Sequence, residues 1–222
     1  MIKRKSDEAH DILRQRIMCA DLPPGALVDE RALMDELGIG RTPLRESIVR
    51  LAQEGLVVSQ GRRGYFVAET SPLDLFRAFE IRREIECFAA ARAAERRTQA
   101  DIDGFDAFLA RLDVELPAHR DDVPWNLEAD EEFHRLIMAA SDNRFAEQYQ
   151  AFLFGLSVRS LYLSRVPVTL VDEEIENYHS IFDAIGLRDA AQAEALMRKH
   201  LTINPLQGLM GETTTASLRR SV

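Results

Sequence analysis

The sequence predicts a mainly α-helical protein in two modules: a small N-terminal module of three helices and a hairpin, then an antiparallel bundle of about six helices. The 222 residues exceed the usual size of one domain but allow two modest cores. Glycine turn signals gather before residue 70, and helical periodicity dominates after it. We expect domains at 1–70 and 71–210, followed by a flexible polar tail at 211–222.

The first module opens with a predicted helix at about 7–18, which a Leu-Pro-Pro-Gly sequence ends. One face of this helix is apolar, formed by Ile12, Leu13 and Ile17. Leu27 and Val28 suit a short strand beside the later hairpin. Asp29 is expected to cap the helix around 33–37, because its carboxylate can accept the N–H groups of the first turn.

Residues 33–51 have the spacing of a helix-turn-helix. After a Gly-Ile-Gly turn, a second helix opens with Thr42 as its expected cap and Pro43 in its first position, where a missing N–H donor costs nothing. Its inward stripe consists of Leu44, Ile48 and Leu51. Arginines are therefore left at the outer entry of the helix, from which a recognition helix contacts base edges.

A basic hairpin follows, with short strands expected in 55–60 and 65–67 around a Gly-Arg-Arg-Gly turn. Either motif alone also occurs as ordinary packing or as a solvated surface hairpin. In this order, within one 35-residue stretch, they predict a winged helix-turn-helix that binds double-stranded DNA. The residues expected to contact DNA are Arg31, Arg41, Thr42, Arg45, Arg62, Arg63 and Gly64. For Arg31, an ordinary surface arginine is the competing interpretation.

The formal net charge of −9 is unevenly distributed. Residues 1–70 hold 11 Lys and Arg against 11 Asp and Glu, while residues 71–222 hold 17 against 26. A neutral first module can still present a positive face, whereas the acidic second module should stay off DNA.

The cysteine content and the lack of long apolar segments indicate the cellular compartment. Cys19 and Cys87 are too few and too far apart for a disulfide framework or a cysteine metal site, which fits a reducing cytosol. The N-terminus lacks the apolar run of a signal peptide, and no segment approaches the roughly 20 apolar residues of a membrane span. We expect a cytoplasmic protein with no membrane partner.

Six helices are predicted in the second module, separated by short polar or proline-containing breaks. Short connections between long helices imply antiparallel neighbours, hence a bundle. The expected helices are 72–97, 101–116, 123–141, 143–165, 170–187 and 189–207.

Four polar side chains of this bundle are candidates for a metal site. Asp130 and His134 are four residues apart on one helix face. His179 and His200 lie about nine residues before and twelve after one turn, so at about 1.5 Å per residue they can reach a similar level. A carboxylate with three imidazoles suits a divalent transition metal: zinc first, then nickel, cobalt or manganese.

The alternative interpretation is that these histidines are hydrogen-bonded packing residues that bind no ion. His10 and His119 share no face with the other histidines, and we expect both on the surface.

Motifs along almost the whole chain resemble a known family. The stretch 24–67 resembles the winged helix of GntR-type regulators, through Arg41-Thr42-Pro43-Leu44-Arg45-Glu46 and Glu54-Gly55-Leu56. The remainder resembles the ligand-binding FCD domain of the FadR subfamily. Its motifs are Glu80-Ile81-Arg82-Arg83-Glu84-Ile85-Glu86, Asp130-Glu131-Glu132-Phe133-His134, Tyr178-His179 and Leu196-Met197-Arg198-Lys199-His200. Gly40 departs from the pattern, since the family often has Ser or Thr there, and this affects one phosphate contact.

The resemblance implies a homodimeric transcription factor that binds a short inverted repeat. It implies a divalent metal held by Asp130, His134, His179 and His200. It also implies a small organic acid as effector, with Arg82 pairing with its far end and Arg159 as a second candidate. A structural salt bridge from Arg82 to Glu86 is the competing interpretation. A long acyl thioester is a less suitable effector, because the relatives that bind one lack these histidines.

The predicted function is a metabolite-responsive repressor that a small carboxylate releases from DNA. A metal-ion sensor is one alternative. A metal-dependent hydrolase or lyase is another, disfavoured because Glu131 and Glu132 are expected to face away from the Asp130–His134 edge, which leaves no clear general base. We therefore predict that the protein is not an enzyme.

Overall fold

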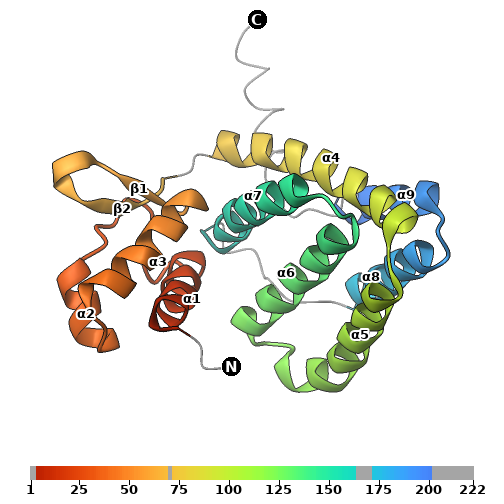
Figure 1. Ribbon diagram of the computed structural model, residues 1–222, viewed down its shortest axis with the longest axis horizontal. Helices are drawn as coiled ribbons and strands as arrows, with labels where there is room; N and C mark the ends of the chain where they lie inside the picture. The colour runs from red at the N-terminus through yellow and green to blue at the C-terminus, as the bar shows by residue number, and fades with distance from the viewer. Residues whose placement is uncertain (1–3, 70–71, 164–171, 202–222) are drawn as a thin grey trace, which may run out of the picture. The chain divides into compact units, whose positions relative to one another are not determined.

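The computed structural model in Figure 1 describes residues 4–69, 72–163 and 172–201. The chain forms two compact units, Met1–Leu75 with Ala151–Ser164, and Phe76–Gln150 with Arg165–Val222. The expected join near residue 70 lies close to the division at Leu75, whereas the grouping of residues 151–164 with the first unit was not expected. The predicted tail at 211–222 and the side chain of Arg159 lie outside the described residues. None of the described helices is long and apolar enough to cross a membrane.

In residues 4–69, the described start of the N-terminal unit, the helices are α1 (Lys5–Met18), α2 (Glu30–Leu37) and α3 (Arg41–Gln53). Helix α3 packs against α1 and α2. The inward stripe predicted for α3 is confirmed, because all three side chains are fully buried. They are Leu44, Ile48 and Leu51.

The hairpin consists of β1 (Val57–Ser59) and β2 (Tyr65–Val67), paired antiparallel. A short 3₁₀ helix, Gly61–Arg63, forms its tip. Gly61 and Gly64 have φ angles of +61° and +102°, values at which a residue with a Cβ would be strained. The strand expected at 27–28 is reduced to a single bridge, from Leu27 to Phe66 of β2.

The two helix starts in this unit differ from each other. Asp29 caps α2 as predicted, since its carboxylate accepts two backbone N–H groups at 2.9 and 3.0 Å. The cap predicted for α3 is wrong: the helix begins at Arg41, and extended Gly40 is its N-cap, without a side-chain bond. Thr42 and Pro43 are thus already inside the first turn. Pro43 is tolerated there because the first N–H groups of a helix have no helical partner.

The prediction that His10 is a surface residue is also wrong. Only 5% of His10 is exposed, and its Nε2 lies 2.6 Å from Oε1 of Glu54, directly after α3. The ring fills part of the α1–α3 contact, where an ion partner satisfies its polar atom. His119 is more open: its side chain is 39% exposed and lies 3.1 Å from Asp122.

The second unit is helical, as predicted. The helices that follow the join are α4 (Pro72–Arg96), α5 (Gln99–His119), α6 (Val123–Ala140), α7 (Arg144–Leu163), α8 (Asp172–Gly186) and α9 (Ala190–His200). The start of α4, up to Leu75, and the part of α7 from Ala151 onward are grouped with the first unit. Helix α5 starts two residues early because Thr98 and Asp101 form a capping box. It also continues past Pro117, which has no N–H to bond the carbonyl four residues earlier. Asp122 and Asp189 cap α6 and α9.

A large apolar core lies among these helices, and α8 contacts both α5 and its sequence neighbour α9 (Figure 1). Aromatic rings dominate its centre. Phe105 stacks on Phe182 at 4.2 Å between ring centroids, and Phe133 stacks on Tyr178 at 3.8 Å. The Phe133 ring also lies against two histidines, with 5.0 Å between its centroid and that of His134 and 5.5 Å to that of His200.

Candidate functional site

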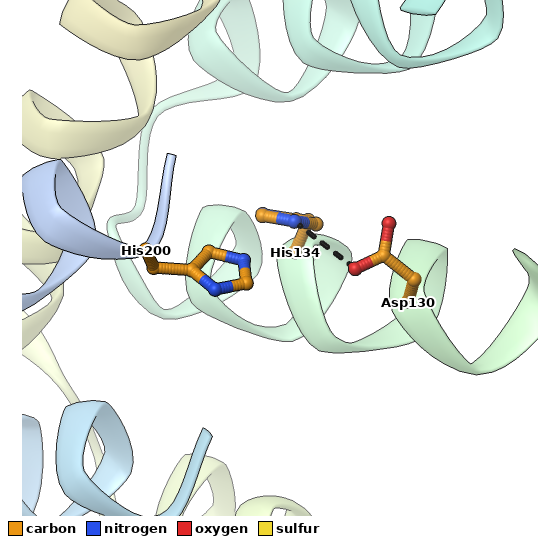
Figure 2. A group of neighbouring side chains, drawn as sticks. All are labelled: Asp130, His134 and His200. Carbon is orange, nitrogen blue, oxygen red and sulfur yellow. Dashed lines mark ion pairs between the residues drawn. The ribbon is translucent and has the colours of Figure 1, made fainter. Parts of the chain in front are cut away.

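Three side chains converge inside the helical unit. Asp130 and His134 come from α6, and His200 is the last residue of α9. One ligand atom from each lies within 4.8 Å of the others (Figure 2). His134 is buried, whereas Asp130 and His200 are partly exposed. Long-range packing therefore brings together three of the four residues that the sequence nominated.

Two charged residues of α4 hold the His134 imidazole in its orientation. Its Nδ1 is paired with Oε2 of Glu86, a fully buried carboxylate on α4. The other oxygen of Glu86 accepts a 2.6 Å hydrogen bond from Nε of Arg82, one turn earlier on the same helix. His134 Nε2 lies 3.5 Å from Oδ1 of Asp130. The imidazole is thus oriented from one side so that its Nε2 faces the candidate site.

Protonation follows from these contacts. Burial alone would raise the pKa of Glu86, but Arg82 and His134 outweigh it and hold that pKa at about 2. Burial would lower the pKa of His134, yet the carboxylates of Glu86 and Asp130 raise it overall. Burial, together with the charge of His134, lowers the pKa of His200 to about 4. His200 is therefore a neutral imidazole at pH 7, the form that binds a metal.

The donors present fit a divalent transition metal. Imidazole nitrogen and carboxylate oxygen are the ligands that borderline ions accept, at bond lengths of about 2.0–2.2 Å for zinc. Atoms already within 4.8 Å of one another need only small side-chain rotations to reach one ion. A carboxylate behind a ligating histidine, as Glu86 stands behind His134, is the usual outer support of such sites.

His179 is the residue that the structure does not bring to this group. Its side chain is 43% exposed, and its Nε2 lies 3.8 Å from Oδ1 of Asp113 on α5. The neighbouring residue, Tyr178, is fully buried and faces the site, where its hydroxyl donates a 2.7 Å hydrogen bond to Oδ1 of Asp130. Adjacent helix positions differ by about 100° in direction, so only one of the two can point inward.

Arg82 adopts the salt bridge that was its competing interpretation. Its side chain is 6% exposed and bonded to Glu86, and it supports the site through that carboxylate. The sequence motif contained both residues but gave no sign that Glu86 also contacts His134. A pairing between α4 and α6 depends on helix packing, which local spacing does not specify.

The residues expected to contact DNA lie at the surface of the first unit. Arg41 and Thr42 are exposed at the start of α3, and Arg31 is exposed on α2. Arg45 is exposed and bonded to Glu30 of α2 at 2.9 Å. At the tip of the hairpin Arg62 and Arg63 are exposed, and Gly64 is partly exposed.

A winged helix followed by a helical bundle that carries a histidine–aspartate group is the arrangement of a two-domain transcriptional regulator. The profile of bacterial regulatory proteins of the gntR family matches residues 5–67, and the FCD domain profile matches residues 77–202. The chain therefore belongs to the GntR family and carries an FCD domain, as the motifs suggested. It is a transcriptional regulator, not an enzyme.

Similar proteins agree with this assignment. The chain is 26% identical to the HTH-type transcriptional repressor RspR of Escherichia coli, over 88% of this chain and 85% of that one. It is 26% identical to the repressor GlaR of the same organism, over 85% and 89%. The solved structure of E. coli McbR/YncC has the same fold, with a TM-score of 0.74 at 22% identity, over 91% of this chain and 96% of that one.

Proposed function

We propose that this regulator is a repressor whose helical domain binds a divalent transition metal and, through it, a small carboxylate that releases DNA. The observation that carries the proposal is the convergence of Asp130, His134 and His200 within 4.8 Å, supported by buried Glu86. Placing charged and polar groups in an apolar core is costly unless they are paired or bind a ligand. RspR and GlaR are named repressors, which supports repression over activation as the mode of regulation.

The metal would be held by Asp130, His134 and His200. When bound, it would supply an electrophilic centre with coordination positions open to water or to a carboxylate. Zinc is the first candidate ion, and nickel, cobalt and manganese accept the same donors.

We propose two arginines as candidates to pair with the part of the effector acid that does not bind the metal. Arg82 is close to the site but already bonded to Glu86, so an acid would have to share its guanidinium with that carboxylate. Its five N–H donors make sharing possible. Arg159 on α7 is the second candidate.

On the DNA side, we propose that Arg41, Thr42 and Arg45 contact base edges and phosphates of each half-site. The hairpin residues Arg62, Arg63 and Gly64, with Arg31 of α2, contact the flanking backbone. Two chains would bind a short inverted repeat as a homodimer in the cytoplasm, since two-fold symmetry of protein and operator correspond. An effector coupling of about 1–3 kcal/mol would change operator affinity some 5- to 150-fold.

The test combines metal analysis with DNA binding. The operator probe is a duplex that the wild-type protein selects from random DNA, and the ligand probes are acetate, succinate and citrate. We expect about one ion per chain, and weaker DNA binding when an effective acid is added, with a chelator abolishing the response. His134→Ala should lose both the ion and the response, while His119→Ala, which alters an exposed histidine elsewhere, should keep both. Full acid response in the His134 variant would overturn the proposal.

A metal-ion sensor is the second candidate, because the same donors serve an ion that is itself the signal. In that case zinc alone would change DNA affinity, and none of the three acids would add to its effect. Thiolate ligands are absent from the three-residue group, which makes this candidate the weaker one.

A further inference from the structure

The phenol of Tyr178 is an additional polar group at the candidate metal centre. The side chain is fully buried on α8, with its hydroxyl donating to Oδ1 of Asp130 at 2.7 Å. The same oxygen lies 3.5 Å from Nε2 of His134. Oδ1 of Asp130 thus accepts a hydrogen bond from the Tyr178 hydroxyl and also lies near Nε2 of His134, a proposed metal ligand.

The ring that carries this hydroxyl is held tightly. It stacks on Phe133 with 3.8 Å between centroids and 16° between planes. It also meets His200 at 5.6 Å and 67°, in an edge-on arrangement. A rigid ring places its hydroxyl with little conformational freedom, so the hydrogen bond restricts the rotation of the Asp130 carboxylate.

We propose that Tyr178 is the positioning residue of the metal centre: its hydroxyl fixes the Asp130 carboxylate so that an ion is held by one carboxylate and two imidazoles. The inference rests on the proposed metal site. Tyr178 acts through Asp130 and does not itself bind the ion, because its hydroxyl proton is directed at the carboxylate. Hydrogen-bonded carboxylate ligands are the general rule in metal sites, and losing such an outer partner typically weakens metal binding 10- to 100-fold.

This arrangement also explains why the site holds three donors. At the inward position of α8, a third imidazole is replaced by a phenol, and His179 is directed toward Asp113. Three protein ligands leave more of the coordination sphere to an exogenous ligand than four do. Tyr178 therefore favours a centre that is open to an acid.

The decisive variant is Tyr178→Phe, which removes the hydroxyl and keeps the ring stacked on Phe133. We expect the zinc dissociation constant of the full-length protein to rise about 10- to 100-fold. With cobalt as the probe, the visible absorption of the bound ion should change, because the carboxylate is no longer fixed. The purely structural loss of a core contact would leave that spectrum as it is.

Two controls separate positioning from general loosening. Ile181→Val removes one methyl group from the same helix and the same core, and His179→Ala changes the neighbour that points away. Both should bind zinc within twofold of the wild type. If Tyr178→Phe binds as tightly as the wild type, or if Ile181→Val weakens binding equally, the positioning role is overturned.

The outcomes also distinguish this inference from the proposed function. Wild-type protein that takes up no zinc or cobalt would overturn the metal centre itself. If Asp130→Ala and His134→Ala lose the ion while Tyr178→Phe retains it with an unchanged cobalt spectrum, only the positioning role fails.

Discussion

The two units of this regulator place their charges in opposite ways. In the winged helix, ion pairs such as Arg45–Glu30 and Arg50–Asp7 lie near the surface. In the helical unit, ion pairs and one hydrogen bond link a series of polar side chains in the core: Arg82, Glu86, His134, Asp130 and Tyr178.

The difference is informative because the two arrangements have different costs. An exposed ion pair contributes about 0.2–1 kcal/mol and leaves its arginine available to DNA. Moving a charge into a protein core costs several kcal/mol, and an apolar replacement of a whole buried pair is often equally stable. Stability alone therefore does not account for this buried series of polar residues, whereas the proposed binding of a metal and an acid would.

The largest expected loss of stability comes from removing Arg82, the cation at one end of this series of polar side chains. Arg82→Ala leaves the Glu86 carboxylate buried without its arginine, and we expect the free energy of unfolding to fall by about 3–5 kcal/mol. Trp125, on α6, is the only tryptophan of the chain, so its fluorescence in a urea titration reports on the helical unit.

Two variants sharpen this result. Arg83→Ala, at a half-exposed neighbour, should change stability by no more than about 0.5 kcal/mol. Arg82→Met combined with Glu86→Leu should recover much of the loss, since it removes both charges. A double variant as unstable as Arg82→Ala would mean that the pair stabilises the fold directly, contrary to the comparison above.

Metal removal should give the next largest effect, confined to one unit. With free zinc at 100 times its dissociation constant, binding stabilises the folded state by about 2.7 kcal/mol, and a chelator should remove that amount. The fluorescence transition of Trp125 should shift, while hydrogen exchange of α1 and α3 amides in the winged helix should not. Equal shifts in both units would contradict a site confined to the helical unit.

Much of the fold could be predicted from local sequence. The stripe of Leu44, Ile48 and Leu51, the Asp29 cap and the six helices described between residues 72 and 201 follow from periodicity and capping chemistry. The start of α3 could not, because Gly40 and Thr42 are both acceptable caps and only the backbone decides between them.

The grouping of Asp130, His134 and His200 could be predicted only in part. Counting residues from the turn between α8 and α9 placed position 179 at about the same height along the helices as His200. The count did not give the direction in which the side chains of α8 point. The apolar residues of α8 would have given that direction, since they and Tyr178 form one buried stripe that excludes His179: Ile175, Tyr178, Ile181, Phe182 and Ile185. The contact of Glu86 with His134 depends on how α4 packs against α6, for which the sequence contains no local signal.

In the winged helix, the exposed arginines should affect DNA binding more than folding. Arg45→Ala should weaken binding to the selected duplex by about 1–3 kcal/mol, the value of a bidentate base contact. Arg16→Ala, which removes an arginine of α1 that pairs with Glu36, is the matched control and should keep nearly full affinity. Fluorescence anisotropy at fixed salt measures both, and equal losses would assign Arg45 to nonspecific attraction.

The smallest effect is expected from the ion pair between buried His10 and partly exposed Glu54 in the winged helix. Burial lowers the pKa of His10, but the hydrogen bond and charge of Glu54 outweigh it, so the folded pKa is raised above 6.5. The charged pair therefore stabilises the unit fully below pH 6.5, and this contribution is lost as the pH rises through the folded pKa. Hydrogen exchange of α1 and α3 amides between pH 5.5 and 8.5, corrected for intrinsic rates, should show this decline. His10→Gln should remove the decline while His119→Gln preserves it, and an increase of stability with pH in the wild type would show that the imidazole is held neutral.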